Sequence, residues 1–243
     1  MESQPAPKPI PTRNRTGWSS NQLNEVSEMF VDFCASATLP VLDIGAAYGV
    51  ATIPALATGA TVIANDAEMG HLRILKDNAP PQDRRRLILM GGKFPRHVHL
   101  AEESLAAVHA SNVLHFLTGP QLANAAASIA HWLCVGGKLF IQASTPWQKP
   151  FESFVPEFEK RLAEQAEWPG WIEDAHQRFD HPKISQIPNA IHLLDPETLS
   201  KTFTTEGLEI ERCWLYSRRD LAKGMKLDGR ESLGLVAIKR ASL

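Results

Sequence analysis

VLDIGAAYG, at residues 41–49, predicts a short apolar strand that ends in a glycine-containing turn. The residues that follow predict a helix and then a second strand, which ends at the acidic Asp66. Such a turn lets a ligand approach the backbone closely, and a carboxylate after the second strand can bind the hydroxyls of a ribose. We therefore expect an α/β fold that binds a nucleoside at this turn.

The composition is that of an ordinary globular protein. With 243 residues, 44% of them hydrophobic, the chain can form one sizeable domain that carries an insertion. Its formal net charge of −2 gives no overall attraction to nucleic acid, and no apolar run approaches the ~20 residues of a membrane span. The three cysteines are far apart and lack metal-ligand spacing, which favours reduced thiols in a cytoplasmic protein. We expect a flexible tail over residues 1–16 and a single domain over 17–243.

Apolar periodicities predict alternating strands and helices, which is typical of a doubly wound, Rossmann-like and mostly parallel sheet. We expect strands at 41–44, 60–64, 86–90, 105–110, 138–142, 208–216 and 232–239. We expect helices at 20–37, 50–58, 67–77, 120–134 and 196–206. Asp195 is the expected N-cap of the last helix, and Gly136 and Gly137 are expected to end the fourth. The last two strands predict an antiparallel hairpin at the edge of a seven-stranded sheet.

Residues 144–195 interrupt the alternation and form an insertion without a clear strand pattern. Aromatic residues gather there: Trp147, Phe151, Phe154, Phe158, Trp168, Trp171 and Phe179. We expect a helical lid over a small apolar or aromatic substrate, although the same residues could merely pack the lid onto the core. Between residues 151 and 174 the insertion has seven acidic and two basic residues, which disfavours an RNA or DNA substrate.

The glycine turn separates two kinds of nucleoside ligand. A dinucleotide site requires Gly-x-Gly-x-x-Gly, because its glycines let a pyrophosphate lie against the helix N-terminus. This chain has Gly45-x-Ala47-x-Gly49, which puts a methyl group where the phosphate would crowd, and it has no Gly-Lys-Ser/Thr phosphate loop. A ligand with a ribose but no phosphate fits the turn better.

Three motifs together resemble the class I S-adenosylmethionine-dependent methyltransferases. Residues 41–49 are similar to the first motif of that family, and Asp66 matches its acid after the second strand. The segment LCVGGKL at 133–139 is similar to its L-x-P-G-G-x-L motif, with Val135 in place of the proline. The close resemblance covers residues 38–145.

The resemblance implies S-adenosylmethionine as the cofactor and gives the matching residues their roles. Asp66 would accept both ribose hydroxyls, with Ala67 beside the adenine. Where the family often has an acid for the adenine amino group, this chain has Gly92 and Lys93, so we expect backbone contacts there. Trp18 could close over the cofactor or act as a hydrophobic staple. The residues expected around the cofactor are Asp43, Gly45, Ala47, Gly49, Asp66, Ala67, Gly92, Lys93, Asn112 and Trp18.

The segment after the fourth strand carries the candidate catalytic residues, Asn112 and His115. In doubly wound sheets the chemistry lies beyond the carboxyl ends of the strands. His115 could act as a general base because imidazole titrates near neutral pH, or it could be a packing residue. Asn112 could orient substrate or cofactor, or only cap the next turn. The candidate substrate-binding residues are Trp147, Phe151, Phe154, Trp171 and His176.

We thus expect a cytoplasmic enzyme of secondary metabolism that methylates an oxygen or nitrogen of a small metabolite. We expect a monomer or homodimer with no metal, nucleic acid or membrane partner. Two alternatives stay open. Methylation of a carboxylate would need no base and would leave His115 idle. A non-catalytic subunit could keep the fold and the cofactor while depending on a partner protein.

Overall fold

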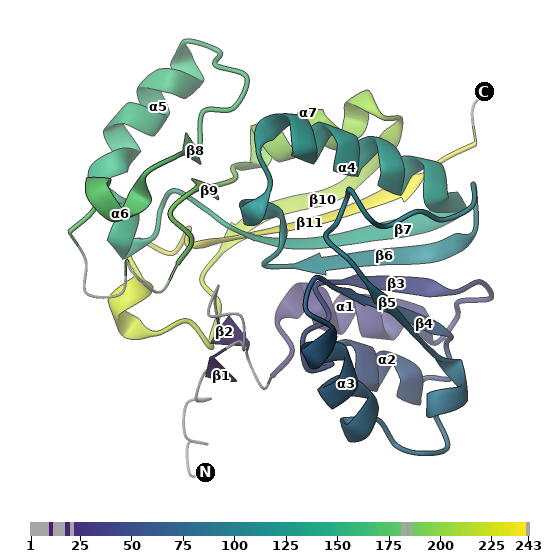
Figure 1. The fold of residues 1–243 in the computed structure, drawn as a ribbon. Helices are drawn as coiled ribbons and strands as arrows, with labels where there is room; N and C mark the ends of the chain where they lie inside the picture. The colour runs from purple at the N-terminus through teal and green to yellow at the C-terminus, as the bar shows by residue number, and fades with distance from the viewer. Residues whose placement is uncertain (1–9, 12–17, 20–21, 181–183, 185–186, 242–243) are drawn as a thin grey trace, which may run out of the picture.

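The computed structural model describes residues 10–11, 18–19, 22–180, 184 and 187–241. Its main feature is a seven-stranded sheet in the order β10-β11-β7-β6-β3-β4-β5 (Figure 1). All seven expected strands are present: β3 Val41–Ile44, β4 Val62–Asp66, β5 Leu87–Gly91, β6 Leu105–Ser111, β7 Leu133–Ser144, β10 Leu208–Tyr216 and β11 Ser232–Lys239. Strands β3 to β7 pair in parallel, whereas β11 is antiparallel to both β7 and β10. The expected antiparallel hairpin at the sheet edge is therefore confirmed.

Helices cover both faces of the sheet, as expected. Figure 1 shows α1 Glu25–Cys34, α2 Thr52–Ala57 and α3 Met69–Asn78 on one side. It shows α4 Gly119–Trp132 and α7 Pro196–Thr205 on the other. Each face has its own buried core: Phe30 and Leu56 pack against one side of the sheet, and Ile129 and Phe203 pack against the other. The sheet is thus buried on both faces, which agrees with the apolar residues that predominate in its central strands.

Local capping sets the ends of several helices. Asp195 is confirmed as the N-cap of α7, because its Oδ1 accepts the backbone N–H groups of Glu197 and Thr198 at 3.0 and 2.9 Å. Thr118 and Gln121 form a reciprocal capping box at the start of α4. Helix α1 is shorter than expected, because Asn24 caps it by accepting the N–H of Ser27.

The expectation that Gly136 and Gly137 end the fourth helix is wrong. Helix α4 stops at Trp132, and Leu133 already has extended backbone angles. The two glycines instead lie inside β7, where the pairing with β6 shifts between Leu105↔Leu133 and Ala107↔Lys138. Gly136 has φ +83°. The glycines therefore form a bulge in the strand, which glycine favours because it tolerates positive φ.

The insertion, residues 144–195, contains helices, as expected. It also contains two short strands that the sequence did not predict. It begins with the 3₁₀ helix η3 Lys149–Phe154, continues as α5 Val155–Ala163, and includes α6 Ala175–Arg178. Strand β8 Trp171–Ile172 pairs antiparallel with β9 Ile191–His192. Figure 1 shows the insertion beside the main sheet, next to the end where β7 leaves it. It has its own apolar core around Phe154, Phe158 and Phe179.

The strand order creates a crevice at the middle of the sheet. The chain passes from β3 outward to β4 and β5, then returns to the other side of β3 as β6 and continues to β7. Loops after β3 and β6 therefore leave in opposite directions, which opens a ligand site at the carboxyl ends of these two strands.

Of the expected tail, only Ile10–Pro11 is described; it forms β1 and pairs with β2 Trp18–Ser19. No helix in the described part of the chain is long and apolar enough to span a membrane.

Candidate active site

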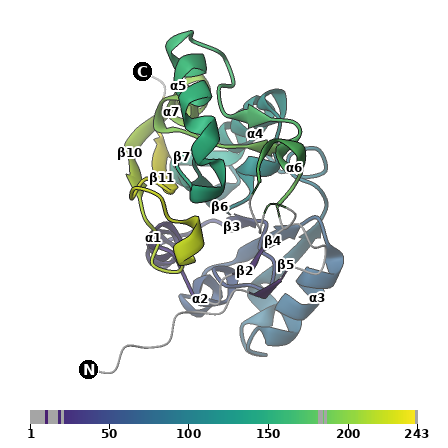
Figure 2. The same cartoon turned by 90° about the vertical axis from the view of Figure 1, so that its left-hand side faces the viewer.

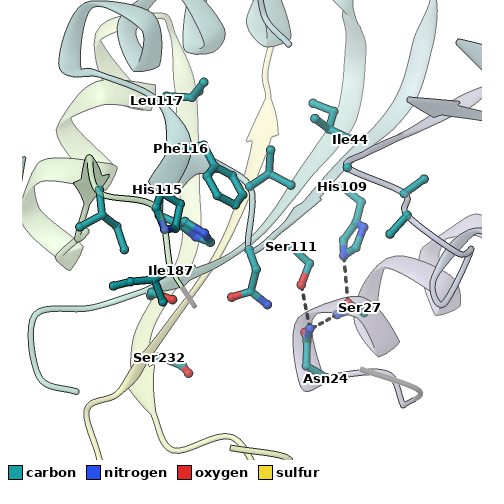
Figure 3. A pocket seen from close by; sticks show the side chains of 18 of the residues that line it. Asn24, Ser27, Ile44, His109, Ser111, His115, Phe116, Leu117, Ile187 and Ser232 are labelled. Carbon is teal, nitrogen blue, oxygen red and sulfur yellow. Dashed lines mark hydrogen bonds between the residues drawn. The ribbon is translucent and has the colours of Figure 1, made fainter. Parts of the chain in front are cut away.

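A cavity of about 1620 Å³ lies at this crevice (Figure 3). It is lined by the turn after β3, the ends of β4 and β6, residues of the insertion, and the loop between β10 and β11. Nine of the expected site residues line it: Asp43, Gly45, Ala47, Asp66, Ala67, Lys93, Asn112, His115 and Phe151. The structure therefore brings the turn after β3, Asp66 and the segment after β6 to one site, whereas the third motif at 133–139 does not line it.

The turn after β3 is built from backbone in the left-handed region. Gly45 has φ +70°, Ala47 +44° and Gly49 +90°. A Cβ added at Gly45 would lie 2.3 Å from Cγ2 of Val113, so this glycine allows the turn to pack against the segment after β6. Ala47 adopts a conformation that is costly for a residue with a side chain, and its N–H donates to Oδ2 of Asp66 at 3.0 Å. Gly49 does not line the cavity.

Asp66 closes the turn and also faces the cavity. Its Oδ1 accepts the N–H of Glu68 at 2.8 Å and contacts Nδ1 of His71 at 3.1 Å, while Oδ2 accepts the N–H of Ala47. A carboxylate has about four acceptor positions. Three of these positions are used within the protein, by the N–H groups of Ala47 and Glu68 and by the ring of His71.

Asp43 belongs to a buried network that joins β3, β6 and α1. Its Oδ2 accepts the hydroxyl of Thr52 at 2.6 Å, and its Oδ1 lies 2.8 Å from Nδ1 of His109. Nε2 of His109 lies 3.0 Å from Oγ of Ser27 (Figure 3). Because Asp43 accepts, we assign the ring proton to Nδ1, which makes Nε2 the acceptor of the Ser27 hydroxyl. Both oxygens of Asp43 thus hold the protein together at the floor of the cavity.

The loop after β5 borders the expected adenine end. The buried amide of Asn65 donates to the carbonyls of Met90 and Gly92 at 2.9 and 3.0 Å, which fixes this loop against β4. Gly92 itself does not line the cavity, whereas Lys93 does and is exposed. Contacts to a base would therefore come from Ala67 and the segment that begins at Lys93.

Asn112 follows β6 with φ +55°, and its N–H donates to the carbonyl of Gln142 at 2.9 Å. Its side chain faces the cavity and has no hydrogen-bond partner in the described part of the chain. Nearby, the amide of Asn24 donates to Oγ of Ser111 at 2.9 Å (Figure 3). The backbone of Asn112 is thus fixed while its amide stays available to a ligand.

His115 lies in the cavity beside Phe116, with the two ring centroids 4.1 Å apart (Figure 3). Its Nδ1 is buried and has no hydrogen-bond partner among the described residues. Burial lowers the pKa of this imidazole to about 4, and the positive charge of Arg218 contributes in the same direction. His115 is therefore neutral at physiological pH.

Of the five expected substrate-binding residues, only Phe151 lines the cavity. Trp147 packs on Phe158 at 5.5 Å, and Phe154 is fully buried in the core of the insertion. Trp171 packs near His192 at 5.9 Å. His176 is exposed, with its Nε2 2.7 Å from the carbonyl oxygen of Ile187. Most of these aromatic residues therefore stabilise the insertion itself, which is the packing alternative that their composition had left open.

Several cavity residues escaped sequence reasoning. Ile187 and Ile191 from the insertion form part of its apolar lining, as does Met225 from the β10–β11 loop. That loop also contributes basic residues, which a search for clustered basic residues between 218 and 226 could have found.

The side chain of Trp18, an expected cofactor residue, lies outside the described residues. No group of three or more His, Cys, Asp or Glu in the described part is placed to hold a metal ion.

Comparisons with known proteins concern the domain type and the fold. Residues 41–137 match a family model described as a methyltransferase domain. No curated protein matches the sequence. Among solved structures, a Listeria monocytogenes protein assigned to the S-adenosylmethionine-dependent methyltransferases is 15% identical, with a TM-score of 0.64 over 89% of this chain and 97% of that one. One from Mesorhizobium loti is 17% identical, with a TM-score of 0.62 over 88% and 98%.

A third similar structure is the glycopeptide N-methyltransferase MtfA with bound S-adenosylmethionine. It is 16% identical, with a TM-score of 0.58 over 88% of this chain and 87% of that one. At these identities the structures show a shared fold. The residues of this chain also fit the cofactor: the turn brings backbone close to the cavity at Gly45, and the carboxylate of Asp66 lines the same cavity. Residues 41–137 thus match a methyltransferase-domain model, and the chain shares the fold of S-adenosylmethionine-dependent methyltransferases.

Proposed function

We propose that this enzyme methylates an oxygen or nitrogen of a small, apolar or aromatic metabolite held under the insertion. The observation that carries the proposal is the cavity, which joins the cofactor residues to apolar residues of the insertion. Ligand pockets commonly enclose roughly 300–1,000 Å³. At about 1620 Å³, this cavity has room for a cofactor and a small acceptor together.

The proposed cofactor contacts follow the lining of the cavity. Gly45, Ala47 and Asn112 would face the methionine part, Asp66 would bind the ribose, and Ala67 with Lys93 would border the adenine. When bound, S-adenosylmethionine supplies a methyl group activated by its sulfonium. The task of the protein is then to hold the acceptor atom in line with that methyl group and, where necessary, to remove its proton.

His115 is the candidate base on the acceptor side of the site. Its neutral state at physiological pH leaves it able to take a proton. The lowered pKa of about 4 also makes it a weak base, which favours acceptors whose proton leaves readily. That observation supports a second candidate function, methylation of a carboxylate, in which no proton has to be removed.

Labelled S-adenosylmethionine, incubated with the enzyme and a metabolite extract of the native cell, tests the proposal. We expect a labelled small molecule, and S-adenosylhomocysteine should bind the enzyme in isothermal titration calorimetry. Label found only in protein or nucleic acid would contradict the small-molecule assignment. Absence of cofactor binding would contradict the cofactor site itself.

The substitution His115→Ala separates the two candidate functions once a substrate is in hand. If His115 is the base, kcat should fall by about 10²–10⁴-fold. If a carboxylate is methylated, kcat should change by less than about threefold, since no base takes part. The matched control is His131→Ala, at an exposed histidine on α4.

A further inference from the structure

The loop between β10 and β11, residues 217–231, brings positive charge to the mouth of the cavity. Arg218, Arg219, Lys223 and Lys226 all line the cavity. Figure 2 shows this loop, in yellow, next to the insertion. Two further cations, Lys93 and Arg96, line the cavity from the segment after β5. Within a chain whose formal charge is −2, this is a local concentration of positive charge.

The carboxylates that line the cavity do not neutralise these cations. They are Asp43, Asp66 and Asp220. Asp43 and Asp66 are engaged by the hydrogen bonds described above, and Asp220 lies 3.1 Å from Nε of Arg218. Within the described residues, the other five cations have no ion-pair partner: Lys93, Arg96, Arg219, Lys223 and Lys226.

The loop is fixed in place by a buried acid at its end. Oε1 of Glu231 accepts the consecutive N–H groups of Leu227, Asp228 and Gly229 at 2.7–2.9 Å. The loop is also tied to the start of the insertion, because Gln148 donates to the carbonyl of Glu231 at 2.9 Å and the hydroxyl of Thr145 donates to that of Arg230. The cations are therefore presented by a loop with a defined conformation.

The lining of the same cavity is partly apolar. Phe151, Ile187 and Ile191 come from the insertion, and Met225 comes from the loop. The cofactor has a single α-carboxylate, which can occupy only one of the cationic positions. The remaining cations and the apolar lining together suit a second ligand with an apolar body and an anionic group.

We propose that the methyl acceptor is such an amphiphilic anion, whose carboxylate or phosphate group is held at the cavity mouth by Arg219, Lys223 and Lys226. This proposal rests on the proposed function and specifies its substrate class. The anionic group is the recognition element, and the apolar body extends toward Phe151 and Ile187. The cations of the loop would also attract an incoming anion to the cavity.

Paired fluorescent probes test this proposal on the full-length protein. The probes are 8-anilinonaphthalene-1-sulfonate, which is anionic, and N-phenyl-1-naphthylamine, which has nearly the same body without the charge. Each is titrated into wild type and into the variant Arg219→Gln/Lys223→Gln/Lys226→Gln. We expect the dissociation constant of the anionic probe to rise about tenfold in the variant, since each exposed charge contributes a factor of a few. We expect that of the neutral probe to change by less than about twofold.

A matched control removes the same charge elsewhere. Lys76→Gln/Arg85→Gln/Lys201→Gln replaces three exposed cations that do not line the cavity, and it should bind both probes as wild type does. Equal loss of the anionic probe in the two triple variants would overturn the proposal. Parallel loss of the neutral probe would also overturn it, because the substitutions would then have changed the cavity rather than an anion site.

Two further measurements complete the test. 1-Naphthoate and 1-naphthyl phosphate should displace the anionic probe from wild type, and their relative strength identifies the preferred group; displacement by neither would contradict the proposal. S-Adenosylhomocysteine should bind wild type and the loop variant equally in calorimetry. Weaker binding to the variant would assign these cations to the cofactor and overturn the proposal. Failure of wild type to bind S-adenosylhomocysteine would contradict the proposed function alone, since the probe comparison does not depend on it.

Discussion

Asp66 is proposed to bind the ribose of the cofactor, and it also shapes the turn on which that site would be built. Its carboxylate holds the N–H groups of Ala47 and Glu68, so it fixes the turn after β3 and the start of α3 at once. The sequence predicted its position from strand order. It could not predict that three of its acceptor positions are taken by the protein, because the partners are backbone groups brought together only by the fold.

The substitution Asp66→Asn should weaken cofactor binding. The amide keeps the size of the side chain but loses the charge and one acceptor atom, and hydrogen bonds to charged groups contribute about 1.5–3 kcal/mol. We expect the dissociation constant of S-adenosylhomocysteine to rise about 10- to 100-fold in calorimetry. Asp77→Asn, at an exposed position of α3, is the matched control. Unchanged affinity in Asp66→Asn would remove this residue from the cofactor site.

His192 gives the fold a dependence on pH that no sequence pattern indicated. It is fully buried next to Trp168, and its Nδ1 lies 3.1 Å from the carbonyl oxygen of Leu117. Burial lowers the pKa of His192 to about 4, despite opposing effects of the Leu117 hydrogen bond and of Asp195. As pH falls from 6.5 toward 4, the unfolded chain binds a proton that the folded chain does not, so the free energy of unfolding decreases.

The substitution His192→Asn should reduce this acid sensitivity. Asparagine can still donate to the Leu117 carbonyl but does not titrate. Between pH 7 and pH 4.5, the free energy of unfolding should decrease by about 2 kcal/mol less in the variant than in wild type. In wild type, the unfolded chain binds the additional proton at His192 over about two pH units of this interval, and each unit changes the free energy of unfolding by about 1.4 kcal/mol. Urea unfolding at both pH values measures the difference. The same pH dependence in both proteins would show that His192 binds its proton in the folded chain as readily as in the unfolded chain.

At the scale of elements, the strands could be predicted more closely than the insertion. β10 and β11 have the bounds expected from the sequence, although the pairing between them shifts register between Ile210 and Arg212. The glycine pair at 136–137 was misassigned because a helix end and a strand bulge can both take a glycine at positive φ, as at Gly136. The aromatic residues of the insertion were ambiguous for a similar reason: composition shows that they are buried, but not whether a ligand or other side chains cover them.

Glu231 should control the conformation of the β10–β11 loop. Burial alone would raise the pKa of this carboxyl, but hydrogen bonds from the N–H groups of Gly229 and Leu227 outweigh it and lower the pKa to about 2. The stabilisation is therefore present above pH 4.5 and is lost as pH falls toward 2. In Glu231→Gln the charge is absent at every pH. The loop should then open more often, because local opening depends on such hydrogen bonds.

Trypsin can report this opening, since the loop contains arginine and lysine residues from 218 to 230. At neutral pH we expect cleavage within the loop of Glu231→Gln to be at least about fivefold faster than in wild type, as located by mass spectrometry. Glu206→Gln, at an exposed position after α7, should be cleaved like wild type. Equal protection of the loop in Glu231→Gln would show that its ties to Thr145 and Gln148 are sufficient.

At the scale of the whole molecule, the proposed cofactor side of the site could be predicted from the sequence better than the proposed acceptor side. The family match at residues 41–137 contains the turn after β3, Asp66 and the segment after β6, which are the proposed cofactor contacts. The insertion and the β10–β11 loop, which form the proposed acceptor side, lie outside it. The donor could be predicted because its chemistry requires a fixed turn and acid. The acceptor side could not, because charge and apolar surface are assembled there from segments far apart in the sequence.

This division predicts how the molecule responds to ligands. The cofactor would contact both β3 and β6, on either side of the crevice, so its binding should stabilise the whole sheet rather than one loop. At a concentration 100 times its dissociation constant, S-adenosylhomocysteine should add about 2.7 kcal/mol to the free energy of unfolding. For a chain of this size that corresponds to a rise in Tm of about 5–10 °C in differential scanning calorimetry. In Asp66→Asn the same ligand concentration should give a rise at least about 3 °C smaller, because a tenfold weaker affinity removes about 1.4 kcal/mol of this stabilisation. A single transition that shifts as a unit is the expected result, and a ligand that protects only part of the chain would show that the two sides of the crevice unfold independently.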